Sequence, residues 1–212
     1  MRNKVIRIGK EIAEQITISF FVSSLVVLFI FFGFYKKIDD TLSLLNMITI
    51  GEKKVQTQEI KFDSIKKRLA VYPTWGSIWA TLEIPDIGIN IPVYQGDTLD
   101  IIQYGAGHFS GSYFPGEGGS IILAAHNSRQ HFMYLPKLDL GAKVIVKANY
   151  GTFTYEVVDA KVIRDNDMAS LPIQTEKETL MMYTCWPTNT IGFKSKRYVV
   201  YTELIGVELN EG

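Results

Sequence analysis

The sequence has very little cysteine, because Cys185 is the only one among 212 residues. A single thiol excludes an intrachain disulfide framework, and it excludes zinc or iron–sulfur sites that need several cysteines. An unpaired thiol outside the cell is exposed to oxidation, so its presence in an extracellular domain would indicate a use. The chain also lacks excess charge, since 22 basic residues balance 22 acidic ones. No global field therefore draws it toward nucleic acid, and no internal repeat or low-complexity tract occurs.

Charge is missing altogether from one long run. Residues 16–35 read ITISFFVSSLVVLFIFFGFY, and a helix of that length spans about 30 Å, the thickness of the hydrocarbon core of a bilayer. A buried core helix would usually carry polar residues on at least one face. A cleaved signal peptide would usually have a shorter apolar region, and no small-residue cleavage site follows this run. We interpret the run as an uncleaved transmembrane anchor.

Basic residues on the two sides of this run predict its orientation. Four precede it and two follow it, namely Arg2, Lys4, Arg7 and Lys10, then Lys36 and Lys37. Basic residues favour the cytoplasmic side of a membrane, and acidic residues count for little. The sequence therefore predicts a cytoplasmic tail over 1–15, a signal anchor over 16–35, and translocation of everything after residue 36.

The translocated part divides into a stalk over 36–73 and a β domain over 74–207. The spacing of Ile65 and Leu69 predicts a stalk helix near Phe62–Ala70, which ends before Pro73. Short alternating segments follow and predict strands, at Ile78–Ile84, Ile89–Tyr94, Ser120–Ala125, Lys143–Ala148, Thr152–Val158, Glu178–Thr184 and Arg197–Leu204. The segments 99–104 and 131–138 are expected to be helical, and Pro92 suggests that its strand lies at an edge. Many short strands predict a small, mostly antiparallel barrel or sandwich.

Cys185 stands at the end of one expected strand, two residues before Pro187. Proline cannot continue a sheet ladder, so the strand should finish close to the cysteine and present its side chain at a rim. A small buried hydrophobe is the usual role of a free cysteine, and it remains the alternative. A nucleophilic role would require a base or cation that supplies thiolate, and a group that stabilises an oxyanion.

Three histidines compete for the role of that base. His126 directly follows the apolar run SIILAA, so it too should emerge at a strand end. His131 opens a short helical piece and is interpreted as a surface or capping residue, while His108 is interpreted as a packed loop residue that orders a turn. Spacing favours His126. Arg197 would reach the thiol if the last strand runs beside the strand of Cys185, and it would otherwise be a solvated arginine.

Three segments resemble the signature segments of the sortase family, in the order of the family. They are Ala124-Ala125-His126-Asn127, Tyr183-Thr184-Cys185 and Arg197-Tyr198-Val199-Val200. Residues 76–85 and 107–119 are also similar to the first strand of the family and to the loop before its histidine strand. The resemblance covers residues 75–205, and it is specific because the segments occur together. It implies an eight-stranded sortase barrel with short helices, in which Cys185 is the nucleophile, His126 the general acid and base, and Arg197 the residue that holds substrate and stabilises the oxyanion.

Two positions depart from the pattern of the family. Met181 and Met182 stand where relatives often have Thr-Leu, a mild change in a packed strand, and Asn127 stands where several relatives carry arginine. The N-terminal anchor makes the chain most similar to class D sortases. Two absences agree with that class: no hydrophobic segment follows Gly206, and the stalk has no Asp-Pro-aromatic motif.

The resemblance implies a cysteine transpeptidase that cleaves an LPXTG-like sorting signal between Thr and Gly and attaches the protein to a peptidoglycan amine. Expected partners are secreted proteins with such a C-terminal signal, a peptidoglycan precursor and the membrane of a Gram-positive cell, with no nucleic acid, metal or organic cofactor. The loop over 159–178 would form part of the signal-binding groove, and its Asp165 and Asp167 are too few oxygen ligands for calcium. Two alternatives stay open, an anchored cysteine hydrolase and an anchored β domain that acts as a scaffold.

Overall fold

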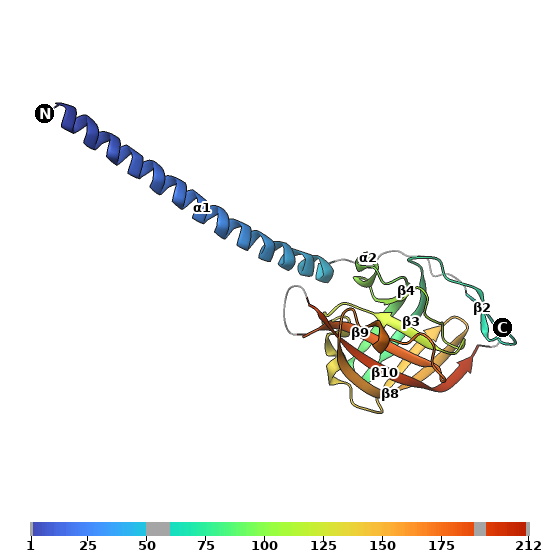
Figure 1. Ribbon diagram of the computed structural model, residues 1–212. Helices are drawn as coiled ribbons and strands as arrows, with labels where there is room; N and C mark the ends of the chain where they lie inside the picture. The colour runs from blue at the N-terminus through green and yellow to red at the C-terminus, as the bar shows by residue number, and fades with distance from the viewer. Residues whose placement is uncertain (1, 50–59, 189–193, 211–212) are drawn as a thin grey trace. The chain divides into compact units, whose positions relative to one another are not determined.

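The computed structural model describes residues 2–49, 60–188 and 194–210. Contacts divide the chain into two compact units, Met1–Thr49 and Ile50–Gly212. The first unit is the single helix α1, Arg2–Thr49 (Figure 1). Its part Lys10–Tyr35 is long and apolar enough to cross a membrane, with a mean hydropathy of 2.5 over an 18-residue window. The Thr17 and Ser23 hydroxyls donate hydrogen bonds to carbonyls one turn back, so these polar groups are satisfied within the helix.

The second unit is built around a closed barrel with the strand order β10–β8–β7–β3–β4–β5–β6–β9. The β4–β5 and β6–β9 pairs are parallel, and the other barrel pairs are antiparallel. The barrel strands are β3 (Ile78–Ile84), β4 (Ile89–Gln95), β5 (Ala106–His108), β6 (Ser120–Ala124), β7 (Lys143–Ala148), β8 (Gly151–Arg164), β9 (Thr179–Trp186) and β10 (Lys196–Leu209). The expected mainly β, eight-stranded barrel is therefore confirmed.

Short helical elements connect the strands. They are η1 (Pro85–Ile87), α2 (Leu99–Ile102), η2 (Phe132–Lys137) and η3 (Met168–Ser170). Helical pieces were expected near α2 and η2. Strand β5 was not expected, because it has only three residues with a glycine in the middle. That is too short to show the alternation of apolar and polar residues that indicates a strand.

Pro92 does not lie in an edge strand, because β4 pairs with both β3 and β5 in the closed barrel. It faces Thr81 of β3, and the pairing of β4 with β5 begins at the next residue, Val93. Proline is tolerated at this point because the side of β4 toward β5 is not yet hydrogen-bonded there.

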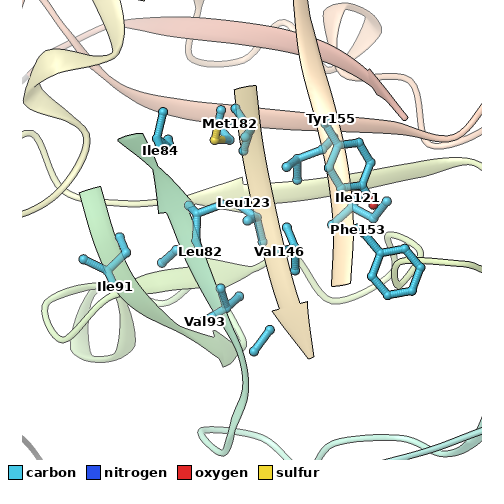
Figure 2. Close-up of a cluster of buried hydrophobic side chains, with 14 of the residues drawn as sticks. Leu82, Ile84, Ile91, Val93, Ile121, Leu123, Val146, Phe153, Tyr155 and Met182 are labelled. Atoms are coloured by element: carbon cyan, nitrogen blue, oxygen red, sulfur yellow. The ribbon is translucent and has the colours of Figure 1, made fainter. Parts of the chain in front are cut away.

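Alternation along the strands separates the barrel interior from its outer face. Leu82, Leu123, Met182 and Tyr155 point into the interior, where they pack together with no exposed surface (Figure 2). The intervening residues form a second cluster on the outer face, composed of Ile122, Ile163, Leu171, Met181 and Val199 with Phe109, Tyr183 and Tyr201 packed against it. Strand β6 is buried along its whole length because both of its faces are covered.

The helix expected near Phe62–Ala70 is wrong. These residues form a hairpin of β1 (Lys61–Asp63) and β2 (Arg68–Val71). The Asp63 carboxylate accepts hydrogen bonds from the backbone of Ile65 and Lys66, and Lys67 adopts a positive φ of 49°, so the chain turns instead of winding on. Ile65 and Leu69, whose spacing suggested one face of a helix, do not share a buried face, because Ile65 is 94% exposed and Leu69 is buried.

Tertiary contacts explain why the hairpin wins over a helix. Its Leu69 is buried, and the backbone N–H of Leu69 donates to the Glu117 carboxylate. Phe62 stacks on Tyr150 with ring centroids 5.2 Å apart. The hairpin is therefore packed against the barrel, in the part of the chain that was expected to be a separate stalk.

Candidate active site

The three residues singled out from the sequence come from adjacent parts of the barrel, where β6, β9 and β10 are neighbours. Cys185 lies on β9 and Arg197 on β10, and His126 follows the end of β6 by two residues. Cys185 is the penultimate residue of β9 and is partly exposed. Pro187 directly follows the strand and lacks the N–H that a further ladder bond would need. The nucleophile candidate is thus held by a sheet at the point where the sheet ends.

Cys185 and Arg197 face each other directly across the antiparallel pair of β9 and β10. Directly opposite residues point to the same face of a sheet. Thr184 is buried in the interior, and Tyr183 belongs to the outer cluster. Alternation therefore turns the Cys185 side chain outward, together with that of Arg197.

His126 lies two residues after β6, which ends at Ala124. The parallel pairing of β6 with β9 joins Ile122 with Met181 and Ala124 with Tyr183. The backbone N–H of Ala125 donates to the Tyr183 carbonyl at 3.3 Å, so Ala125 still follows β9. The chain therefore leaves β6 at the same end of the sheet at which β9 carries Cys185, and His126 is the next residue.

The His126 ring is partly buried, and this desolvation lowers its pKa, while a hydrogen bond with the Leu99 backbone opposes the shift. Its Nε2 is buried and makes no hydrogen bond with any residue that the structure describes. Burial without a partner is costly for a polar atom in a folded interior. This nitrogen is therefore an unsatisfied polar atom within the described part of the site.

The Arg197 guanidinium is held by its own loop. Its Nη1 donates to the carbonyl oxygens of Lys194 and Lys196, at 2.8 and 2.9 Å. Burial lowers the pKa of the neighbouring Lys194, and the Cys185 thiol acts in the opposite direction. Two cationic residues therefore lie near Cys185: Arg197, its cross-strand partner, and Lys194.

A barrel with a thiol, an imidazole and a guanidinium on or next to adjacent strands can be compared with known proteins. Residues 82–205 match the family model described as the sortase domain. Sortase D of Bacillus subtilis (strain 168) is 34% identical over 139 residues, which cover 66% of this chain and 70% of that protein. The chain belongs to the sortase family.

Solved structures agree with this family. A Clostridium perfringens sortase D5 transpeptidase matches with a TM-score of 0.57 and 27% identity, covering 64% of this chain and 83% of that one. Sortase A of Listeria monocytogenes shares the fold, with a TM-score of 0.58 and 20% identity over 63% of this chain and 91% of that one. The chain is thus a sortase-family transpeptidase that is similar to class D sortases, as its sequence segments suggested.

The other two histidines of this sortase are both buried. His108 is packed as expected. Its ring nitrogens form hydrogen bonds with the Gln95 amide oxygen, the Ser112 hydroxyl and the Tyr113 carbonyl. Burial lowers its pKa to about 4. The interpretation of His131 as a surface residue is wrong, since it is 4% exposed. It does occupy the N-cap position of η2, as the capping alternative expected, but its side chain makes no capping hydrogen bond.

Sequence reasoning missed several groups around the site. The segment after β4 brings Leu99 to His126, and it brings Asp97 near Tyr183. Burial raises the pKa of Asp97 and raises that of Tyr183 to about 12. No motif marks these residues, because their relation to the site arises from the barrel closing rather than from local spacing.

The loop between β8 and β9 covers part of the outer cluster beside the site. Strand β8 runs to Arg164, so this loop begins later than expected. Leu171 is buried in the cluster, and the Tyr201 hydroxyl donates to the Ser170 carbonyl at 2.8 Å. Asp167 accepts a hydrogen bond from the Ser170 hydroxyl. Within the described residues, no group of three or more His, Cys, Asp or Glu side chains is arranged to hold a metal ion.

Proposed function

We propose that this sortase is a membrane-anchored cysteine transpeptidase with Cys185 as nucleophile, His126 as general acid and base, and Arg197 as oxyanion stabiliser. The observation that supports the proposal is the direct pairing of Cys185 with Arg197 across β9 and β10, together with the position of His126 two residues after β6, the strand that pairs with β9. A thiol, a titratable imidazole and a fixed cation are the groups that acyl transfer through a thioester needs.

In the first step the Cys185 thiolate attacks the carbonyl carbon of threonine in an LPXTG-like signal. Arg197 stabilises the negative charge that develops on the carbonyl oxygen. The carbon–nitrogen bond to glycine then breaks, and protonated His126 gives its proton to the departing amine. The products are a thioacyl enzyme and a free C-terminal fragment.

In the second step a peptidoglycan amine attacks the thioester carbon, and neutral His126 takes the proton from that amine. The carbon–sulfur bond breaks and the thiolate of Cys185 leaves. The secreted protein is then joined by an amide bond to the cell wall. Each proton lost in one step is returned in the other, so the cycle needs no oxidant, reductant or cofactor.

The anchor gives the enzyme access to both substrates. The apolar part of α1 is long enough to span a bilayer, and the basic residues around it favour an N-terminus in the cytoplasm. The barrel would then lie outside, where secreted proteins and lipid-linked peptidoglycan precursors meet. Confinement at one membrane face raises their effective concentration.

The test is a cleavage assay with the full chain in detergent and an LPXTG-type peptide, with and without a peptidoglycan-type diamine. We expect an amide-linked product by mass spectrometry, and no cleavage by Cys185→Ala. Release of the free threonine acid at every amine concentration would instead indicate a hydrolase. Failure of the wild type to cleave any such peptide would refute the proposed activity.

A further inference from the structure

A second imidazole lies against His126. The rings of His126 and His131 meet edge to face, with centroids 6.5 Å apart and an interplanar angle of 70°. His131 is 4% exposed, so it is one of the few buried polar side chains of the barrel unit. The mechanism proposed above gives this side chain no role.

Hydrogen bonds fix His131 within a closed turn. Its Nδ1 is 2.6 Å from the Ser128 hydroxyl oxygen, and its backbone N–H donates to the Ser128 carbonyl at 3.0 Å. The backbone N–H of Phe132 donates to the His126 carbonyl, also at 3.0 Å. Phe132 itself is fully buried. The turn therefore runs from His126 to Phe132 and is closed by the hydrogen bond to the His126 carbonyl, while the Ser128 side chain holds the Nδ1 of the His131 ring.

The other polar contacts of His126 are few among the described residues. A hydrogen bond with the Leu99 backbone is one, and its Nε2 makes no bond within the described part of the chain. Small errors in the placement of a catalytic group are costly. The His131 ring, in edge-to-face contact with His126, is placed to restrain it.

We propose that His131, held by Ser128, is a positioning residue that fixes the orientation of the His126 ring and keeps water away from it. The inference rests on the proposed role of His126 in acid–base catalysis. It does not make His131 a catalytic residue, because His131 acts on the reaction only through its neighbour.

The electrostatics agree with a positioning role. Burial lowers the pKa of His131 to about 4, with a smaller contribution in the same direction from the adjacent His126. His131 is therefore neutral near pH 7 and adds no charge that would oppose protonation of His126. Charged or titratable residues of this turn and of the neighbouring segments do not contribute to the shifted pKa of either histidine, namely Asp97, Asp100, Arg129, Tyr183, Cys185, Lys194 and Arg197.

The experiment compares Ser128→Ala, His131→Ala and His131→Asn in the full chain in detergent micelles. Ser128→Ala removes the bond and His131→Ala removes the ring, whereas asparagine keeps a hydrogen-bonding group near the position of Nδ1. The His126 ring is titrated by NMR without substrate, which three histidines make tractable. Peptide cleavage gives kcat and KM, and thermal unfolding gives the Tm. Ser64→Ala, at an exposed hairpin position, is the matched control.

We expect Ser128→Ala and His131→Ala to lower kcat by roughly 10- to 100-fold with little change in KM, as for a misplaced catalytic group. Water should then reach His126, so its titration midpoint should move up toward that of a solvated histidine. In His131→Asn, kcat should be partly restored and the His126 titration midpoint should lie closer to that of the wild type. A lower Tm with the His126 titration unchanged would overturn the inference, as would wild-type kcat in Ser128→Ala. Because the titration needs no substrate, it tests the positioning role even if the wild type proves inactive.

Discussion

Cys185 of β9 and Arg197 of β10 are direct cross-strand partners on the outer face of the barrel. The guanidinium does not lie free in solvent, since carbonyl oxygens of its own loop fix it. A cation fixed before substrate arrives needs little reorganisation when charge develops in the transition state. The pairing therefore gives the sulfur a preorganised electrostatic partner.

Two substitutions at Arg197 should show how much of its effect on catalysis comes from the positive charge and how much from the planar guanidinium. Arg197→Ala should lower kcat/KM by roughly 10²–10³-fold, the usual cost of one oxyanion donor. Arg197→Lys should recover only part of this loss, because the planar fork is replaced by a single ammonium. Steady-state cleavage of an LPXTG-type peptide measures both. Lys196→Ala, the exposed neighbouring residue, is the control, and equal losses in Lys196→Ala and Arg197→Ala would contradict the assigned role.

The orientation of the chain can be tested with protease on intact protoplasts. Protease should remove the domain after residue 36 and leave the N-terminal tail protected, because the basic residues before the span outnumber those after it. Antibodies against each end would detect the fragments. Protection of the barrel would reverse the proposed orientation.

Folding stability should fall in mild acid because of buried histidine. Burial lowers the pKa of His108 to about 4 in the folded chain, whereas an unfolded histidine titrates at about 6.5. Between these values the unfolded chain binds more protons, so the stabilisation is complete above pH 6.5 and is lost as the pH falls toward 4. His108 alone should cost about 2 kcal/mol between pH 7 and pH 5. Urea unfolding at both pH values measures this, and His108→Gln should show a smaller difference; an undiminished one would refute the assignment.

Glu178 should be important for stability although it lies away from the site. Its carboxylate accepts hydrogen bonds from the backbone N–H of Gly116 and Gly118 and from the Tyr155 hydroxyl. Tyr155 is fully buried, so Glu178→Ala leaves its hydroxyl without that acceptor and should cost about 3 kcal/mol. Calorimetry on Glu203→Ala provides the comparison, because Glu203 pairs with Lys177 at the surface and its loss should barely move the Tm. Similar Tm values for both variants would show that the Glu178 bonds contribute little.

Gly107 should tolerate no side chain. An added Cβ would lie 2.5 Å from the Gly96 carbonyl oxygen and 2.6 Å from the Ile102 side chain. Gly107→Ala should therefore displace the segment that carries Leu99 to His126, and it should reduce both kcat and stability, the latter by about 1–3 kcal/mol. In Gly206→Ala the new atom meets its nearest neighbour at 3.7 Å, so this control should behave like the wild type. Normal activity in Gly107→Ala would show that the segment can move without consequence.

Patterns of apolar and polar residues along the sequence were sufficient to predict most of the strands. Alternation predicted β3 and β7 with the bounds that the structure shows, and the fully apolar run before His126 predicted a strand buried on both faces. They failed where a distant contact decided the outcome. The Phe62–Ala70 segment has helical spacing, yet it forms a hairpin because Leu69 and Phe62 pack on the barrel.

The sequence by itself determined the apolar span, the strand periods and the end of β9 at Pro187, because each depends on neighbours within a few residues. It also marked Cys185, His126 and Arg197 as candidates through the three signature segments. Only the tertiary structure decided that the strand before His126 pairs with the strand of Cys185, since the β6–β9 register joins residues 59 positions apart in the chain. The burial of His131 beside His126 is likewise visible only in the tertiary structure. Strand register and barrel closure depend on how the whole set of strands packs, which no local pattern contains.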